Sequence, residues 1–142
     1  MLAMTKPRSQ EYESAVALRV GLRQFLARSE QIIRKHDLTP ERYELLLLIK
    51  TMADGEATVG KLGDRLAIGQ SAATQLARRA EDAGLIQRTM SPRDARVHPL
   101  RLTNEGERRL DRALVALREE RTQLAAHLHP LLNDARPARR RR

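Results

Sequence analysis

Residues 58–84 read TVGKLGDRLAIGQSAATQLARRAEDAG, and their pattern predicts two short helices joined by a tight turn. Thr58 is a residue type that caps helix N-termini, so the first helix is expected to begin directly after it. Residues 68–69 make a tight connection, and residues 70–83 then form the second helix. Gly84 ends that helix, because glycine readily adopts the left-handed conformation that follows many helix C-termini.

The second helix is expected to carry small apolar residues inside and polar residues outside, which is typical of a helix-turn-helix motif. The outward residues are Gln70, Ser71, Thr74, Gln75 and Arg78. Such side chains suit the base edges in the major groove of DNA, where glutamine can pair with adenine and arginine with guanine. A solvated helix face without a partner is the alternative interpretation.

A β-hairpin with a basic tip is predicted after this motif. Residues 85–90 and 97–102 read as two short strands around the loop of residues 91–96. Arg93 and Arg96 of this loop could enter the minor groove, where the negative potential favours guanidinium groups. An ordinary surface turn with an incidental ion pair is the alternative.

Long amphipathic helices are predicted at both ends of the chain. Residues 9–36 carry apolar side chains at three- and four-residue steps. A second helix runs from Pro40 to about Met52, with Thr39 as its cap. From Thr103 onwards, a last long helix carries leucines on a seven-residue repeat. The predicted fold class is therefore mainly α with a small β-hairpin wing, a winged helix-turn-helix lobe with long terminal helices.

Three prolines constrain this arrangement. Pro99 cannot donate to a strand ladder, so we expect it on an edge or on the outer side of the hairpin. Pro130 and Pro137 are expected to limit the extension of the last helix.

The two terminal helices are long compared with the lobe between them, so their apolar faces exceed what one chain can cover. Pairing of two copies would cover them and would set two recognition helices about one DNA turn apart. The predicted dimerisation residues are Leu18, Leu22, Leu114, Leu117, Leu124 and Leu128. Core packing within one subunit is the alternative.

The charge balance makes polyanions the expected partners, because 27 Lys and Arg outnumber 18 Asp and Glu for a net charge of +9. Aromatic residues make up 2%, which argues against proteins that stack single-stranded bases. No basic segment carries Trp and Phe anchors, so no membrane partner is expected. The absence of cysteine, of a secretory leader and of a long apolar run favours the cytoplasm.

Signatures of catalysis are missing from the sequence. No glycine-rich phosphate loop, nucleophile elbow or catalytic carboxylate pair stands out, so we expect neither an enzyme nor a cofactor. His127 and His129 could supply two metal ligands, but without cysteine or a nearby carboxylate we expect no metal site. Phe25, Tyr43 and Leu46 could line a pocket, although core packing explains them equally well.

The hairpin region resembles the multiple antibiotic resistance regulator (MarR) family. The resemblance rests on Gly84-Leu85-Ile86-Gln87-Arg88, then Asp94-Ala95-Arg96, then Leu102-Thr103-Asn104-Glu105-Gly106. It extends without gaps from Thr58 to Gly106, and the segment from Leu38 to Tyr43 is also similar to the family.

This resemblance implies a dimeric regulator of transcription that binds double-stranded DNA, usually as a repressor, and that a small-molecule effector can release. It also implies that Asp94 holds the wing arginines in place and that the terminal helices form the dimer interface. Thr58 could add a phosphate contact to its capping role. The expected organisation is a single domain of residues 1–136, with dimerisation helices 9–36 and 103–136, a DNA-binding lobe 40–102 and a basic, disordered tail 137–142.

Two other function classes stay open. An architectural protein would bind DNA by charge and shape without a fixed operator, and the high positive charge suits it. An interaction module would use the winged fold to bind a protein instead of a nucleic acid.

Overall fold

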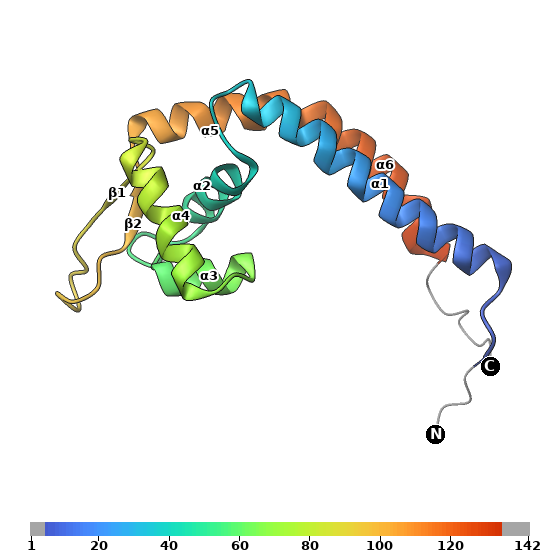
Figure 1. The fold of residues 1–142 in the computed structure, drawn as a ribbon, viewed down its shortest axis with the longest axis horizontal. Coiled ribbons are helices and arrows are strands. Elements are labelled where there is room, and N and C mark those ends of the chain that lie inside the picture. The colour runs from blue at the N-terminus through green and yellow to red at the C-terminus, as the bar shows by residue number, and fades with distance from the viewer. Residues whose placement is uncertain (1–4, 135–142) are drawn as a thin grey trace. The chain divides into compact units, whose positions relative to one another are not determined.

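The structure is a computed structural model that describes residues 5–134, which form helices and one short hairpin (Figure 1). The helices are α1 (Ser9–Arg34), α2 (Pro40–Thr51), α3 (Val59–Leu66), α4 (Gln70–Asp82), α5 (Asn104–Ala116) and α6 (Arg118–Asp134). The strands are β1 (Ile86–Arg88) and β2 (Leu100–Leu102). The prediction of a mainly α fold with a β-hairpin wing is therefore confirmed, whereas the predicted tail 137–142 lies outside the described residues.

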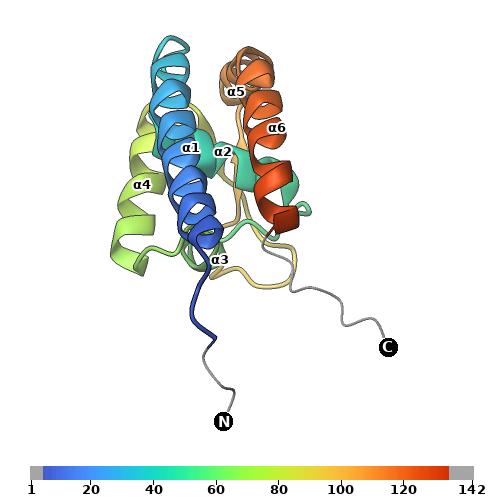
Figure 2. The same cartoon turned by 90° about the vertical axis from the view of Figure 1, so that its right-hand side faces the viewer.

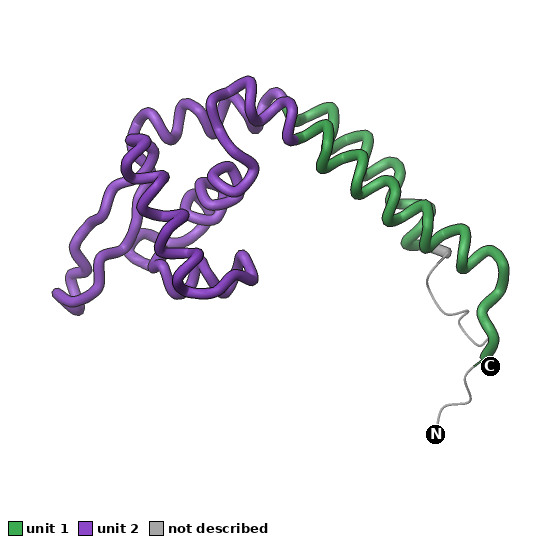
Figure 3. The backbone as a smooth tube through the Cα atoms, viewed as in Figure 1, with its two compact units in different colours: residues 1–29, 117–142 green, residues 30–116 purple. Residues whose placement is uncertain are grey.

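The chain divides into two compact units, which Figure 3 shows in different colours. One unit takes residues 1–29 and 117–142, of which 5–29 and 117–134 are described. The other takes residues 30–116 and contains the lobe predicted for residues 40–102. This second unit is larger than the predicted lobe because α5 packs on α2 and β2.

The core of the second unit is built around α2. Thr39 precedes this helix, and its hydroxyl oxygen accepts a hydrogen bond from the backbone N–H of Arg42 at 3.2 Å. Leu45 and Leu46 of α2 are almost completely buried, and Tyr43 and Ile49 of the same helix lie with them in the core. The predicted cap is therefore present, and core packing accounts for Tyr43 and Leu46.

Small residues allow α3 and α4 to pack closely. The buried side chains of α4 are Ala73, Ala77 and Ala80. Gly63 of α3 faces this helix, and a Cβ added there would lie 3.2 Å from the Cβ of Ala73. Gly84 follows α4 with a φ of +74°, in the left-handed region that favours glycine. The predicted end of this helix is therefore correct.

The hairpin is antiparallel, with Ile86 opposite Leu102 and Arg88 opposite Leu100. Its strands are shorter than predicted, with three residues each. Pro99 directly precedes β2 of a two-stranded sheet, in which both strands are edges, so the expected edge position holds and the alternative of an outer side is wrong. Pro99 is buried, and its carbonyl accepts the backbone N–H of Thr89 at 2.8 Å. Proline has no backbone N–H to donate, but its apolar ring is well suited to the core.

The last predicted helix is two helices in the structure. The interruption falls at Leu117, which is buried, between the end of α5 and the start of α6. A leucine repeat reports which side of a helix is buried, so it does not reveal a one-residue interruption. Pro130 also lies inside α6, which continues to Asp134, so the prediction that this proline limits the helix is wrong. Because Pro130 is exposed and stands in the last turns, it removes one backbone hydrogen bond without disturbing a core. Pro137 lies outside the described residues.

The first unit is a pair of antiparallel helices, in which α6 runs beside the first part of α1 (Figures 1 and 2). Two polar contacts join them. A ring nitrogen of His127, Nε2, lies 3.0 Å from the carbonyl oxygen of Ala17, and the guanidinium of Arg28 lies 4.0 Å from the carboxylate of Glu120. One contact lies near the start of α6 and the other near its middle, so both join α6 to the stretch of α1 from Ala17 to Arg28.

Candidate nucleic-acid interface

The outer face of α4 is polar and accessible. Gln70, Ser71, Gln75 and Arg78 are exposed, as the sequence predicts for a face that reads DNA. Thr74 is half-buried, and its hydroxyl donates to the carbonyl of Gln70 at 2.9 Å. The hydroxyl of Thr74 is therefore engaged within the helix, while the other side chains extend into solvent.

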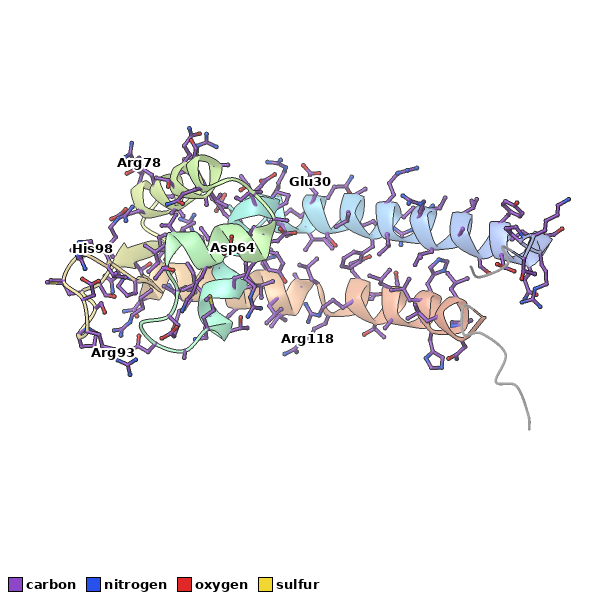
Figure 4. The ribbon with its side chains drawn as sticks, turned by 90° about the horizontal axis from the view of Figure 1, so that it is seen from below. Glu30, Asp64, Arg78, Arg93, His98 and Arg118 are labelled. Atoms are coloured by element: carbon purple, nitrogen blue, oxygen red, sulfur yellow. The ribbon has the colours of Figure 1, made fainter. Side chains whose placement is uncertain are left out.

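Arg78 is the residue of α4 whose positive charge is most available to a ligand. Figure 4 shows it at the surface of the second unit, and its guanidinium makes no hydrogen bond or ion pair with any described residue. Arg79, which the sequence analysis missed, is also exposed and donates to the side-chain oxygen of Gln75 at 3.4 Å. The four-residue spacing of Gln75 and Arg79 on one helix face is the signal that could have identified this pair.

The tip of the hairpin is held by its own side chains. The hydroxyl oxygen of Ser91 accepts the backbone N–H groups of Arg93 and Asp94, each at 3.3 Å. One carboxylate oxygen of Asp94 accepts the backbone N–H of Arg96 at 3.0 Å and its guanidinium Nε at 3.2 Å. The loop is therefore closed by hydrogen bonds although the strands that carry it are short.

Arg96 lowers the pKa of Asp94, chiefly through its backbone N–H and then through its guanidinium. A carboxylate that accepts two such bonds is stabilised in its charged form. This geometry fits the predicted role of Asp94 in stabilising the wing. The arginine that Asp94 binds is Arg96, not Arg93.

Arg93 projects from the tip without a hydrogen-bond partner for its guanidinium among residues 5–134 (Figure 4). Its charge does act on Glu56, which precedes α3. Lys61 is the main cause of the lowered pKa of Glu56, and Arg93 contributes to it. The tip of the hairpin and the start of α3 therefore share an electrostatic environment.

Thr58 caps α3, because its hydroxyl oxygen accepts the backbone N–H of Lys61 at 3.4 Å. This bond uses the hydroxyl as an acceptor only. A phosphate contact from its O–H therefore stays a prediction.

Two ion pairs brace the hairpin, and the sequence analysis missed both. Arg88 of β1 donates to Glu81 of α4 at 3.1 Å. Arg101 of β2 donates to both carboxylate oxygens of Asp54, at 2.7 and 2.8 Å. Asp54 and Arg101 are far apart in the chain, so no local pattern indicates their pairing. The hairpin that carries Arg93 and Arg96 is thus tied both to α4 and to the turn before α3.

The predicted dimerisation residues differ in how much of each side chain is exposed. Leu22 is 38% exposed, Leu18, Leu124 and Leu128 are half-buried, and Leu114 is half-buried in the second unit. Leu117 is only 2% exposed within its own chain, so it has little surface left for a partner. The most exposed large apolar residues of α1 are Tyr12, Val16 and Leu26, which the leucine pattern did not identify.

The histidines do not gather with other ligands. Within residues 5–134, no group of three His, Asp or Glu side chains could hold a metal ion. His127 contacts the backbone of α1, and His129 lies near Asn133. In the same described part of the chain, no helix has the length and apolar character needed to cross a membrane.

Comparison with known proteins agrees with this architecture. A model of the MarR family matches residues 36–97. The HTH-type transcriptional repressor MdtR of Bacillus subtilis is 31% identical, and the match covers 72% of either chain.

Two solved structures are similar over most of their length. YusO of Bacillus subtilis has a TM-score of 0.64 at 26% identity, covering 92% of this chain and 100% of YusO. MepR of S. aureus, solved as a complex with DNA, has a TM-score of 0.71 at 19% identity, covering 84% of this chain and 88% of MepR. The chain therefore belongs to the MarR family of winged helix-turn-helix transcriptional regulators.

Proposed function

We propose that the protein is a homodimeric repressor that binds pseudo-palindromic sites on double-stranded DNA, with α4 in the major groove and the wing in the minor groove. The observation that carries this proposal is the exposure of arginines without an ion-pair partner among the described residues, on two neighbouring elements of one unit. Arg78 on α4 and Arg93 on the hairpin both offer guanidinium groups that no described carboxylate binds. Base edges and phosphates are the ligands that such groups recognise.

The similar proteins support this proposal. MdtR is a repressor of the same family, and the structure of MepR contains DNA. In a helix-turn-helix protein the second helix of the motif reads the major groove, which corresponds to α4 here.

Competition for binding tests sequence specificity. Labelled duplex from upstream of the protein's own gene is titrated with the protein at moderate salt, in the presence of unlabelled random duplex. A regulator keeps a preference of roughly a thousandfold or more for its operator. An architectural protein, which the net charge of +9 also suits, loses the labelled duplex to random DNA at comparable concentrations.

A two-fold dimer is the second part of the proposal. Tyr12, Val16 and Leu26 of α1 are each 60% or more exposed, and a partner subunit would remove this apolar surface from water. Sedimentation equilibrium of the wild type is expected to give twice the mass of one chain. Leu26→Lys should shift the equilibrium towards monomer, whereas Gln24→Lys, at an exposed polar position of α1, should not.

Release by a small molecule is the third part. Phe25 lines a cavity of about 130 Å³ in the first unit, together with Arg28, Leu124 and His127. Glu120 also lines this cavity, with its carboxylate 4.0 Å from the guanidinium of Arg28. An apolar ring beside that guanidinium suits a small aromatic acid that displaces the carboxylate of Glu120. Such a ligand weakens DNA binding if it prefers a dimer whose recognition helices are misplaced. Aromatic carboxylates are therefore tested for release of bound operator, and Phe25→Ala is expected to abolish the release while leaving DNA affinity unchanged.

A further inference from the structure

We propose that His98 is a phosphate contact of the wing that acts in its protonated form, so that DNA affinity rises as the pH falls. This inference rests on the proposed function and adds a residue and a pH dependence to it.

The register of the hairpin fixes the position of His98. The backbone N–H groups of Thr89 and Ser91 donate to the carbonyls of Pro99 and Val97, at 2.8 and 3.3 Å. Strand pairing therefore continues past β1 and β2, with His98 between two bonded positions. The proline that follows also restricts the backbone of His98 to extended conformations. Its side chain is exposed, and Figure 4 shows it on the hairpin.

The same register identifies the face of the hairpin on which His98 lies. Residues that are directly opposite share a face, and faces alternate along a strand. Because Arg88 is opposite Leu100, His98 is opposite Met90 and lies on the face of Arg88. The same face carries Leu100, which is buried, and the guanidinium of Arg88 bonds to Glu81 of α4. The base of this face therefore packs on the unit beside α4, and His98 lies further out towards the tip.

That face should border the DNA backbone. The major and minor grooves are separated by a sugar–phosphate strand, so a protein with α4 in one groove and the hairpin tip in the next must straddle that strand. Met90 on this face is apolar, and Arg88 is held by Glu81. His98 is therefore the group of this face that can offer a new positive charge to the phosphates.

The imidazole of His98 is available for this contact, because it makes no hydrogen bond or ion pair with any residue from 5 to 134. A protonated imidazole has two N–H donors and a positive charge. Histidine is also the residue type that changes charge between about pH 5 and 8. Since a nearby phosphate favours the charged form, binding to DNA should be coupled to the uptake of a proton.

The other charged groups around the hairpin leave this role open to His98. Four carboxylates around the hairpin are bound to cations, in the pairs Glu81–Arg88, Asp94–Arg96, Asp54–Arg101 and Glu56–Lys61. Asp82, the remaining carboxylate of α4, is exposed. Arg78 and Arg93 are exposed cations on α4 and on the hairpin tip.

The test is the pH dependence of DNA affinity. The Kd of the full chain for a labelled duplex is measured by fluorescence anisotropy at pH 6 and pH 8, at constant ionic strength. The wild type should bind more tightly at pH 6, by up to about tenfold per pH unit for each proton taken up. His98→Gln should lose most of this dependence, and His98→Arg should bind tightly at both pH values.

His129→Gln is the matched control, because His129 is an exposed histidine of α6 outside the hairpin, and it should behave as the wild type does. A wild-type affinity that does not change with pH, or an unchanged dependence in His98→Gln, overturns the role of His98 and leaves the proposed function intact. Absence of binding to any duplex, even at low salt, instead overturns the proposed function and this inference with it.

Discussion

Gly106, in the first turn of α5, lies directly against the main chain of Leu85. A Cβ added to Gly106 would be 2.0 Å from the carbonyl oxygen of Leu85. The backbone N–H of Thr103 donates to that same carbonyl at 3.0 Å, and the hydroxyl of Thr103 donates to the carbonyl of Gly84. The Leu-Thr-x-x-Gly sequence thus joins the start of α5 to the connection between α4 and β1, which fixes where the hairpin leaves the body of the unit.

Gly106→Ala should therefore destabilise the protein. The atoms that the new methyl group meets are backbone atoms of Leu85, which cannot turn away as a flexible side chain can. We expect a loss of about 3 kcal/mol in the free energy of unfolding, as in overpacked cores. Urea denaturation followed by circular dichroism measures it.

Gly60→Ala is the control for that substitution. Gly60 lies in α3 with nothing within 4 Å of an added Cβ, and alanine is the better helix former. The stability of this variant should be equal or higher by about 0.5 kcal/mol. Equal stability of Gly106→Ala and the wild type would contradict the close approach of α5 to Leu85.

Arg78 and Arg93 should contribute to DNA binding in different ways. Arg78→Ala should weaken binding to the operator by about 1–3 kcal/mol and reduce the preference over random DNA, since a base contact is lost. Arg93→Ala and Arg96→Ala should weaken binding to both kinds of DNA and flatten the dependence of log Kd on log salt concentration. Titrations of both duplexes at several salt concentrations measure these effects.

Arg23→Ala is the control for the loss of charge, because Arg23 is an exposed arginine of α1 that belongs neither to α4 nor to the wing. Its affinity for both duplexes should change little. Equal losses on operator and random DNA for Arg78, Arg93 and Arg96 alike would refute the division of roles.

Most of the secondary structure of the second unit could be predicted from local sequence, because helix caps and small residues affect only a few neighbouring positions. Thr39 and Thr58 predict the start of α2 and α3, and the alanines of α4 predict its inner face. The pair of Asp54 and Arg101 could not be predicted, because only the complete fold brings these two surface charges close together. The burial of a proline in the hairpin likewise depends on which side of the hairpin meets the core.

Asp94→Asn should reduce stability in a manner that depends on pH. Arg96 lowers the pKa of Asp94, mainly by its backbone N–H and then by its guanidinium, so the folded state favours the charged carboxylate. A lowered pKa gives stability that is present above the pKa of the unfolded chain and is lost as the pH falls through the folded value. The difference in unfolding free energy between wild type and variant should be present at pH 7 and should shrink below about pH 4.

Chemical denaturation of both proteins at pH 7, 5 and 3 measures this difference. If Asp94→Asn differs from the wild type by the same amount at pH 7 and pH 3, the charged form of Asp94 is not what holds the loop. Glu13→Gln serves as a control, because Glu13 is an exposed carboxylate at the other end of the chain.

Gly21 and His127 should be coupled in the first unit. A Cβ at Gly21 would lie 2.4 Å from the imidazole of His127, so Gly21→Ala must displace the ring from its contact with the carbonyl of Ala17. In the wild-type background the substitution should cost stability, because the lost contact offsets the helix propensity of alanine. In the His127→Ala background the obstacle is gone, and Gly21→Ala should stabilise α1 by about 0.5–1 kcal/mol. A double-mutant cycle in urea measures the coupling, and additive effects would show that the imidazole does not rest on the backbone of α1.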